Sequence, residues 1–225
     1  MAARHVLRLA GWALACVLGI VALGAALGPA WFLIGFGGAT LATVMLVVWL
    51  PRSAHSAFGH GRHARAARRY RVIQALAFSV RRERAAILSR AGCFITLKRL
   101  EPAERLLDKL VPAELDVAER AVWLNNRACA LLEAGTDPHG ALAMVEEATA
   151  LRPDVPAVQH TRGLALLAVG RIDDAIAVFD GMRSGGELAP SLEAERCRDL
   201  ASAWDRKGQT EYAEDYRQRA LQVAR

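Results

Sequence analysis

Six arginines follow the first fifty residues of this sequence, and their guanidinium groups are suited to binding phosphate oxygens. A guanidinium presents a planar set of donors that matches phosphate, and basic residues beside a bilayer attract anionic headgroups. The stretch from 51 to 71 therefore predicts contact with anionic lipid through Arg52, Arg62, Arg65, Arg68, Arg69 and Arg71. A second interpretation, that these charges only set membrane topology, is equally consistent with the sequence.

Histidines occur in the same stretch, at His55, His60 and His63. A metal site is one interpretation, because imidazole is a common metal ligand. No carboxylate or thiol accompanies the three side chains, and Gly59 and Gly61 predict a flexible backbone. We therefore expect solvated histidines and no bound metal.

Signatures of catalysis are missing from the chain. The GxxxxGK and GxGxxG phosphate-binding loops and the HExxH and GxSxG hydrolase motifs are all absent. The cysteines form no CxxC pair and have no histidine at a spacing that suits zinc: Cys16, Cys93, Cys129 and Cys197. The sequence therefore predicts that the chain is not an enzyme and binds no cofactor.

The elements that would position the arginines begin with an apolar run. Between Leu9 and Leu50 there is no Asp, Glu, Lys, Arg or His. Gly28-Pro29 divides the run, since proline interrupts a helix and glycine permits a tight turn. The two parts, at about 9–27 and 30–50, each match a hydrocarbon core of ~30 Å at ~1.5 Å per residue. We predict a transmembrane helical hairpin in residues 1–50.

Tryptophans support this hairpin. Trp12 and Trp49 fall at one predicted interface and Trp31 at the other, as aromatic belts require. A cleaved signal peptide is the alternative for the first segment, but a second apolar segment follows at once. Neither segment contains an ionisable residue, which favours an anchor over a transporter. Small residues are predicted to pack the two helices together: Gly11, Ala15, Gly19, Gly35, Gly38, Ala39 and Ala42.

Charge is distributed unevenly along the chain. Residues 1–84 carry eleven arginines and one acidic residue, whereas residues 85–225 carry 18 basic and 22 acidic residues. Arg4 and Arg8 precede the apolar run and six arginines follow it, so the positive-inside rule predicts that both termini are cytosolic. The distal part is mildly acidic, so we expect no nucleic-acid partner. The excess of arginine over lysine, with abundant alanine, suggests a bacterial cytoplasmic (inner) membrane.

Residues 51–83 are predicted to be a basic juxtamembrane connector that ends in a linking helix. From Arg62 the pattern becomes helical, with one apolar face formed by Tyr70, Ile73, Ala77 and Val80. This helix would lead from the membrane into the distal domain.

Residues 162–179 contain two helical patterns separated by Gly170-Arg171. Gly163 and Leu166 lie on the first pattern, and Ala175 and Phe179 on the second. This arrangement resembles the tetratricopeptide repeat (TPR), in which small residues allow two helices to touch and large residues fill the space beside them.

The preceding unit shows the same arrangement, and Ala141 and Ala175 are separated by 34 residues, the period of the family. Fainter units precede and follow these two. The resemblance implies an all-α fold in which the hairpin is followed, over residues 84–225, by a TPR-like α-solenoid of about three to four helix pairs. A generic helical bundle is the alternative.

The resemblance also implies a concave groove that holds peptides or extended segments of partner proteins. Its lining would include Asn125, Asn126, His160, Thr161 and Arg198. Asparagine can both donate to and accept from a peptide backbone, and arginine can bind a carboxylate.

The sequence as a whole predicts a membrane-anchored TPR scaffold or adaptor that mediates protein–protein interaction at the cytosolic face. Two alternatives remain open. The chain could be a non-catalytic assembly subunit of a membrane enzyme or transport complex. It could instead be a regulator that responds to anionic lipid through the arginine-rich connector.

Overall fold

The computed structural model describes residues 2–223, in which every regular element is a helix. The outer limits of the predicted domains, residues 1 and 225, lie outside this range. Some side chains within it are also outside the description, including those of Arg4 and Arg8, on which part of the topology prediction depends.

The N-terminal hairpin consists of α1 (Ala2–Leu27) and α2 (Pro29–Val44), joined at Gly28 with φ of 96°. Two helices, Ala10–Leu27 and Ala30–Gly59, are long and apolar enough to cross a membrane. Their large apolar side chains are exposed; Leu33, for example, is 71% exposed. Exposure on this scale marks a surface that contacts lipid or another protein rather than water.

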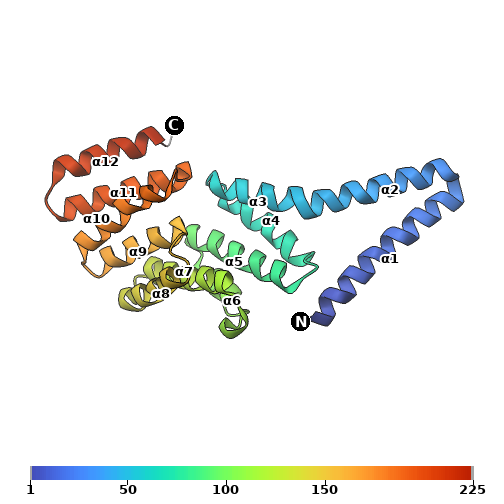
Figure 1. Cartoon of the computed structure of the whole chain (residues 1–225), viewed down its shortest axis with the longest axis horizontal. Coiled ribbons are helices and arrows are strands. Elements are labelled where there is room, and N and C mark those ends of the chain that lie inside the picture. Colours follow the sequence, from blue (N-terminus) through green and yellow to red (C-terminus); the bar gives the residue numbers. More distant parts are fainter. Residues whose placement is uncertain (1, 224–225) are drawn as a thin grey trace.

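The two hairpin helices diverge from their turn (Figure 1). Close to the turn, Phe32 packs on Gly24. Further along, Gly11, Gly19 and Gly38 have no neighbouring atom within 4 Å of the place where a Cβ would stand. The predicted packing of small residues is therefore not made at these positions, because the helices have already separated.

The second apolar helix does not end at Pro51. Helix α2 continues through a π-helical turn, η1 (Met45–Trp49), into α3 (Leu50–Gly59). Proline has no N–H to offer the carbonyl four residues earlier, which is that of Val47. Arg82 donates from Nη2 to this carbonyl at 2.9 Å. The end of the apolar helix is thereby tied to the first helix of the repeat region.

Residues 51–75 form a helix pair rather than a flexible connector. Helix α3 packs against α4 (His63–Ala75), and Gly61, with φ of 70°, makes the turn between them. The two helices approach closely because their contact consists of small buried residues: Ala54, Ala57, Ala66 and Ala67. The predicted flexibility at Gly59 is wrong, since Gly59 completes α3.

The predicted linking helix is also shorter than expected. It ends at Ala75, whereas Val80 begins the next helix, α5, after a break. Ser79 causes the new start, because its hydroxyl caps α5 by accepting a hydrogen bond from Arg82 N at 3.2 Å. Tyr70 is buried as the pattern predicts.

Four further helix pairs complete the described part of the chain, which confirms the predicted solenoid. The first helices of these pairs lie side by side in the order α5, α7, α9, α11. Each second helix packs against the first helix of its own pair. Short 3₁₀ turns lie at Pro112–Glu114 and Met182–Gly185. The pairs are α5 (Val80–Thr96) with α6 (Leu100–Leu107), α7 (Val117–Ala134) with α8 (Pro138–Leu151), α9 (Pro156–Ala168) with α10 (Ile172–Gly181), and α11 (Pro190–Arg206) with α12 (Thr210–Val223).

The third pair shows why the repeat pattern works. Gly163 faces Phe179, whose ring would lie 2.4 Å from a Cβ at this position, so only glycine fits without a shift. Phe179, Leu166 and Ala175 are all fully buried. The roles that the resemblance implies for these four residues are those found in the structure.

The array curls so that its two ends meet. The turn between α3 and α4 lies next to the start of α11 and the end of α12 (Figure 1). The inner side of the array is lined by α5, α7, α9 and α11. Its α11 end lies next to the basic helix pair, which is formed by α3 and α4.

Candidate peptide-binding groove and basic cavity

Polar contacts join the first helices of successive pairs along the inner side of the array. Asn126 of α7 donates from Nδ2 to the Leu88 carbonyl of α5 at 3.0 Å. Cys129 of α7 and Thr161 of α9 lie 3.2 Å apart, Sγ to Oγ1. Between α9 and α11, His160 Nε2 lies 2.8 Å from Asp199 Oδ2. Polar contacts thus bond each of these helices to the next, and Arg206 of α11 adds a bond from Nη1 to the Leu167 carbonyl of α9 at 2.7 Å.

These contacts involve three of the five residues predicted to line the groove. Asn126 is 7%, His160 8% and Thr161 3% exposed. Thr161 also donates its hydroxyl to the Ala157 carbonyl at 3.0 Å. We therefore assign these three side chains to holding neighbouring helices together, because their polar atoms are engaged within the chain.

Asn125 and Arg198 remain accessible, the first half-buried and the second exposed. The Asn125 amide nitrogen lies 3.9 Å from Cys129 Sγ. Its Oδ1 is enclosed and has no hydrogen-bond partner among the described residues. Because this atom is enclosed, a bound peptide would have to displace neighbouring side chains to reach it.

The electrostatics of the inner side disfavour nucleophilic chemistry at Cys129. Burial raises the pKa of its thiol to about 11, and the charges of Glu133 and Glu195 act in the same direction while the Thr161 hydroxyl opposes them. The side chain is thus a neutral thiol at physiological pH rather than a reactive thiolate. The nearby His63 has its pKa lowered by burial, an effect that Glu195 partly offsets.

Arg198 lies where the array meets the basic helix pair. A cavity of about 600 Å³ separates the α3–α4 turn from the start of α11, and both Arg62 and Arg198 line it. Glu195 lines the same cavity. Arg198, which is predicted to bind peptide, and Arg62, which is predicted to bind lipid, therefore line the same cavity.

The arginines predicted to contact lipid fall into two groups. Arg69 is half-buried: its Nη1 donates to the Ser53 carbonyl at 2.7 Å, and its guanidinium carbon lies 5.8 Å from the centre of the Trp49 ring. It holds α4 against α3. The remaining five are exposed: Arg52, Arg62, Arg65, Arg68 and Arg71.

A second cavity, of about 600 Å³, lies between α4, α5 and α6. Six of its lining residues are basic: Arg68, Arg71, Arg90, Arg99, Arg105 and Lys109. Four of these six lie beyond residue 84, in the part of the sequence whose net charge is negative. Averaging over that part hides the local cluster, which only the packing of three helices brings together.

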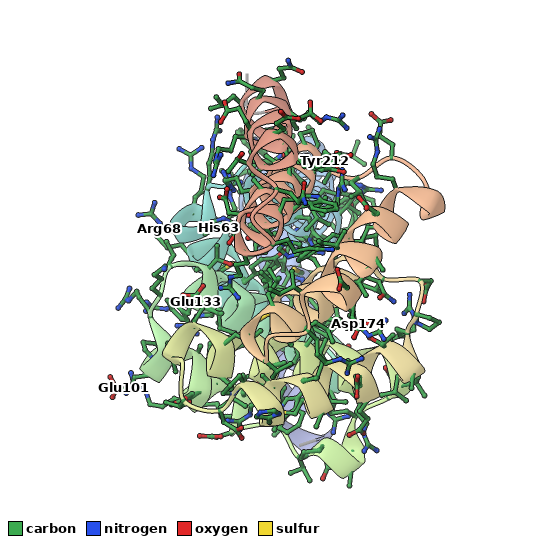
Figure 2. All side chains as sticks on the ribbon, turned by 90° about the vertical axis from the view of Figure 1, so that its left-hand side faces the viewer. His63, Arg68, Glu101, Glu133, Asp174 and Tyr212 are labelled. Carbon is green, nitrogen blue, oxygen red and sulfur yellow. The ribbon has the colours of Figure 1, made fainter. Side chains whose placement is uncertain are left out.

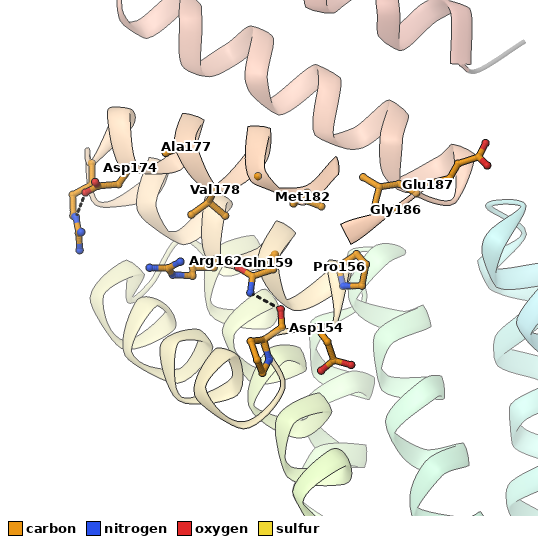
Figure 3. Close-up of a pocket in the computed structure, with 14 residues that line it drawn as sticks. Asp154, Pro156, Gln159, Arg162, Asp174, Ala177, Val178, Met182, Gly186 and Glu187 are labelled. Atoms are coloured by element: carbon orange, nitrogen blue, oxygen red, sulfur yellow. Dashed lines mark hydrogen bonds and ion pairs between the residues drawn. The ribbon is translucent and has the colours of Figure 1, made fainter. Parts of the chain in front are cut away.

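A third cavity, of about 560 Å³, lies beside α9 and α10 (Figure 3). Arg162 projects into it, while Arg171 is bonded to Asp174 at 2.7 Å. Asp154 and Glu187 also line it, so basic and acidic side chains are mixed. This cavity shows no preference for ligands of one charge.

Two of the three histidines of the connector bond to its backbone, whereas Nδ1 of His63 is enclosed and has no hydrogen-bond partner among the described residues. His55 donates from Nδ1 to the Pro51 carbonyl at 2.8 Å, and His60 donates to the Ser56 carbonyl at 2.7 Å. Within residues 2–223, no group of three or more His, Cys, Asp or Glu side chains is placed to hold a metal ion.

Comparison with known proteins identifies the fold. No family model matches the sequence, and no curated protein matches it. The structure of TTC0263, a thermophilic TPR protein in Thermus thermophilus, is similar with a TM-score of 0.59 and 19% identity, over 77% of this chain and 89% of that chain.

Two other solved structures are similar at lower scores. MamA has a TM-score of 0.46 at 18% identity, over 76% of this chain and 93% of its own. YrrB, a TPR protein with an unusual peptide-binding site, has a TM-score of 0.46 at 16% identity, over 78% and 85%. At 19% identity, the likeness to TTC0263 shows a TPR-like fold and nothing beyond the fold.

Proposed function

We propose that this chain is a membrane-anchored scaffold that holds a protein or peptide partner on the inner face of its TPR-like array, at the cytosolic side of a bacterial inner membrane. The observation that carries the proposal is the accessible polar surface on the inner side of the array, where Asn125 is half-buried and Arg198 is exposed and lines a cavity of about 600 Å³.

The hairpin supports the anchoring part of the proposal. Two apolar helices expose large side chains, and the second continues into α3 without interruption. The bond from Arg82 to the Val47 carbonyl fixes the array to the end of that helix. An array held in this way would meet its partner at the bilayer, where tethering raises the effective concentration of the groove.

The orientation follows from the charges that flank the hairpin, since Arg52 and the arginines after it lie on the side of the array. The test is cysteine labelling in cells that express the full chain, with the native Cys16 and Cys129 replaced by serine; the other two native cysteines, Cys93 and Cys197, are buried. The Leu27→Cys variant, next to the turn, should react with an impermeant maleimide added outside, and the Arg65→Cys variant should not. The reverse pattern would contradict the cytosolic placement.

Partner capture tests the groove. The full-length protein is crosslinked in cells, purified in mild detergent, and the proteins that accompany it are identified. We expect the double variant Asn125→Ala/Arg198→Ala to lose the partner, because these are the accessible polar residues predicted for the groove.

A matched control separates binding from folding. The double variant Arg120→Ala/Arg217→Ala removes exposed charges that pair with Glu147 and Asp205, away from Asn125. It should retain the partner, and circular dichroism should show both variants folded. Equal retention by both variants would exclude the groove as the binding site.

A further inference from the structure

We propose that the cavity between α4, α5 and α6 is a binding site for an anion that carries two or more phosphate groups. Arg68 and Arg71 of α4 face it together with Arg90, Arg99, Arg105 and Lys109 of α5, α6 and the turns beside them. None of the described residues that line it is acidic. This site lies in a different part of the array from Asn125 and does not depend on the proposed groove.

Arg90 is the most enclosed of the six. Its Nη1 donates to Gln74 Oε1 at 3.1 Å, while its Nε is enclosed and has no partner among the described residues. Burial lowers the pKa of Arg90, and the neighbouring charge of Arg71 acts in the same direction. An anion in the cavity would offset the repulsion between Arg71 and Arg90, because it would supply an opposite charge beside both guanidinium groups.

Phe94 brings two of the cations together. The guanidinium carbons of Arg90 and Arg99 lie 5.4 and 5.3 Å from the centre of its ring. An aromatic face attracts guanidinium groups and limits their freedom, so their donors are already oriented before a ligand arrives. Pre-oriented donors favour a rigid polyanion over a diffuse cloud of counterions.

Carboxylates near the cavity are already paired, one of them with the lining cation Arg105. Glu101 pairs with Arg105, Asp108 with Arg127, and Glu133 with Lys98 at 3.3 Å. Figure 2 shows Arg68, Glu101 and Glu133 along one edge of the molecule. The other lining cations make no ion pair with the described residues: Arg68, Arg71, Arg90, Arg99 and Lys109.

The phosphate chemistry has two sources at this position. A lipid headgroup is one, because α4 and α5 both reach the end of the apolar helix, where Arg82 contacts Val47. A soluble polyphosphorylated compound is the other. A phosphate monoester carries roughly 1.5–2 negative charges at neutral pH and a lipid phosphodiester carries about one, so two phosphates would balance at least two of the lining cations that have no ion pair.

Two experimental arms distinguish these sources. In the first, the full-length protein in uncharged detergent is titrated with tripolyphosphate by isothermal titration calorimetry. In the second, the protein is released from nanodiscs of phosphatidylcholine mixed with phosphatidylglycerol or cardiolipin, and native mass spectrometry counts the lipids retained. Binding in the first arm assigns a soluble ligand. Selective retention of cardiolipin in the second arm assigns a lipid headgroup that carries two phosphates.

Charge-matched variants locate the site. Arg99→Gln/Lys109→Gln removes two exposed cavity cations without touching the core, and should weaken binding by about a hundredfold, since each hydrogen bond to a charged group contributes tenfold or more. Arg90→Gln should weaken it by at least about tenfold. Arg52→Gln/Arg65→Gln removes the same charge from exposed positions outside the cavity and should change affinity less than about threefold.

Two results would contradict the proposed anion site. Failure of both tripolyphosphate and cardiolipin to bind the wild-type protein would exclude the site. An equal loss of affinity in the Arg52/Arg65 control would assign binding to diffuse attraction by the connector. Because the partner capture above uses Asn125 and Arg198, either proposal can fail while the other stands.

Discussion

The two ends of the helical array are held together by different chemistry. Next to the hairpin, Arg69 and Arg82 donate to the backbone carbonyls of Ser53 and Val47, at 2.7 and 2.9 Å. At the far end, Arg196 of α11 makes two bonds of 2.7 Å to the carboxylate of Glu193. Surface pairs such as Arg217 with Asp205 add to this second set.

The difference follows from the composition of the two regions. Residues 1–84 contain eleven arginines and one acidic residue, so their guanidinium groups bond carbonyls, remain without a partner or, as in Arg81 and Arg84, reach carboxylates beyond residue 84. The distal repeats contain enough carboxylates to neutralise their basic residues. The cavities show the same contrast, since the charged residues that line the one beside α4 are all cations and those that line the one beside α9 have both signs. Unneutralised charge is thus concentrated next to the proposed membrane anchor.

The largest effect is expected at Arg196, which is only 2% exposed. Arg196→Met should destabilise α11 and α12 by about 3–5 kcal/mol, because Glu193 is left without its partner in a partly buried position. Arg196 Nη1 also donates to the Phe179 carbonyl at 3.2 Å, a bond that methionine cannot replace. Hydrogen exchange of the full-length protein in detergent measures the loss in these helices.

The exposed Arg217 serves as its matched control. Arg217→Met breaks a surface pair and should cost at most about 1 kcal/mol. If the two variants lowered protection of α11 equally, the buried pair would have no special part in holding the distal end.

The next effect compares two glycines on the first helices of their pairs. Gly163→Ala places a methyl group 2.4 Å from the Phe179 ring and should destabilise the third pair by about 1–3 kcal/mol. Gly92→Ala meets only Asn126 Oδ1, at 3.6 Å, and should stabilise α5 by up to about 1 kcal/mol through helix propensity. Urea unfolding followed by circular dichroism gives both values, and opposite signs are the expected result.

The junction with the hairpin should respond to Arg82. Arg82→Gln loses the bond to the Val47 carbonyl, and we expect local stability around residues 76–84 to fall by about 1–2 kcal/mol. Arg81→Gln is the control, because the Arg81 side chain is 82% exposed and its loss should change stability by less than about 0.5 kcal/mol. Hydrogen exchange at residues 45–52 and 76–84 provides the comparison, and equal exchange in the two variants would show that the joint does not depend on Arg82.

The sequence predicted the distal region better than the junction, for a physical reason. Gly163, Ala175 and Phe179 act within one helix pair, so the spacing of small and large residues is sufficient to predict their contact. The second apolar segment is predicted to end at residue 50, yet a single π turn accommodates the donor that Pro51 lacks, and Arg82, distant in sequence, bonds the freed carbonyl. No local pattern contains that contact.

The same distinction applies to the candidate sites. Asn126 had the right chemistry for a peptide, but its amide bonds Leu88, which is 38 residues away along the chain. The basic cavity needs the angles between α4, α5 and α6, which periodicity does not give. Residue type indicated what these side chains could do, and only the packing of the helices decided which of them remain free to do it.

The smallest effect concerns acid. Arg196 holds the pKa of Glu193 below its ordinary value of 4.5, although burial opposes this. A carboxyl whose pKa is lower in the folded state stabilises the protein above its unfolded pKa, and this contribution is lost as pH falls through the folded value. The stability difference between the wild type and Glu193→Gln should therefore be constant from about pH 7 to about pH 5 and shrink below pH 4.5.

The Arg82 bond joins a guanidinium to a carbonyl, neither of which titrates in this range, so the effect of Arg82→Gln should stay the same over the same interval. Thermal unfolding followed by circular dichroism across these pH values measures both differences. A parallel decline of the two would mean that acid acts on the whole array, and the contrast between its two ends would then not extend to their response to pH.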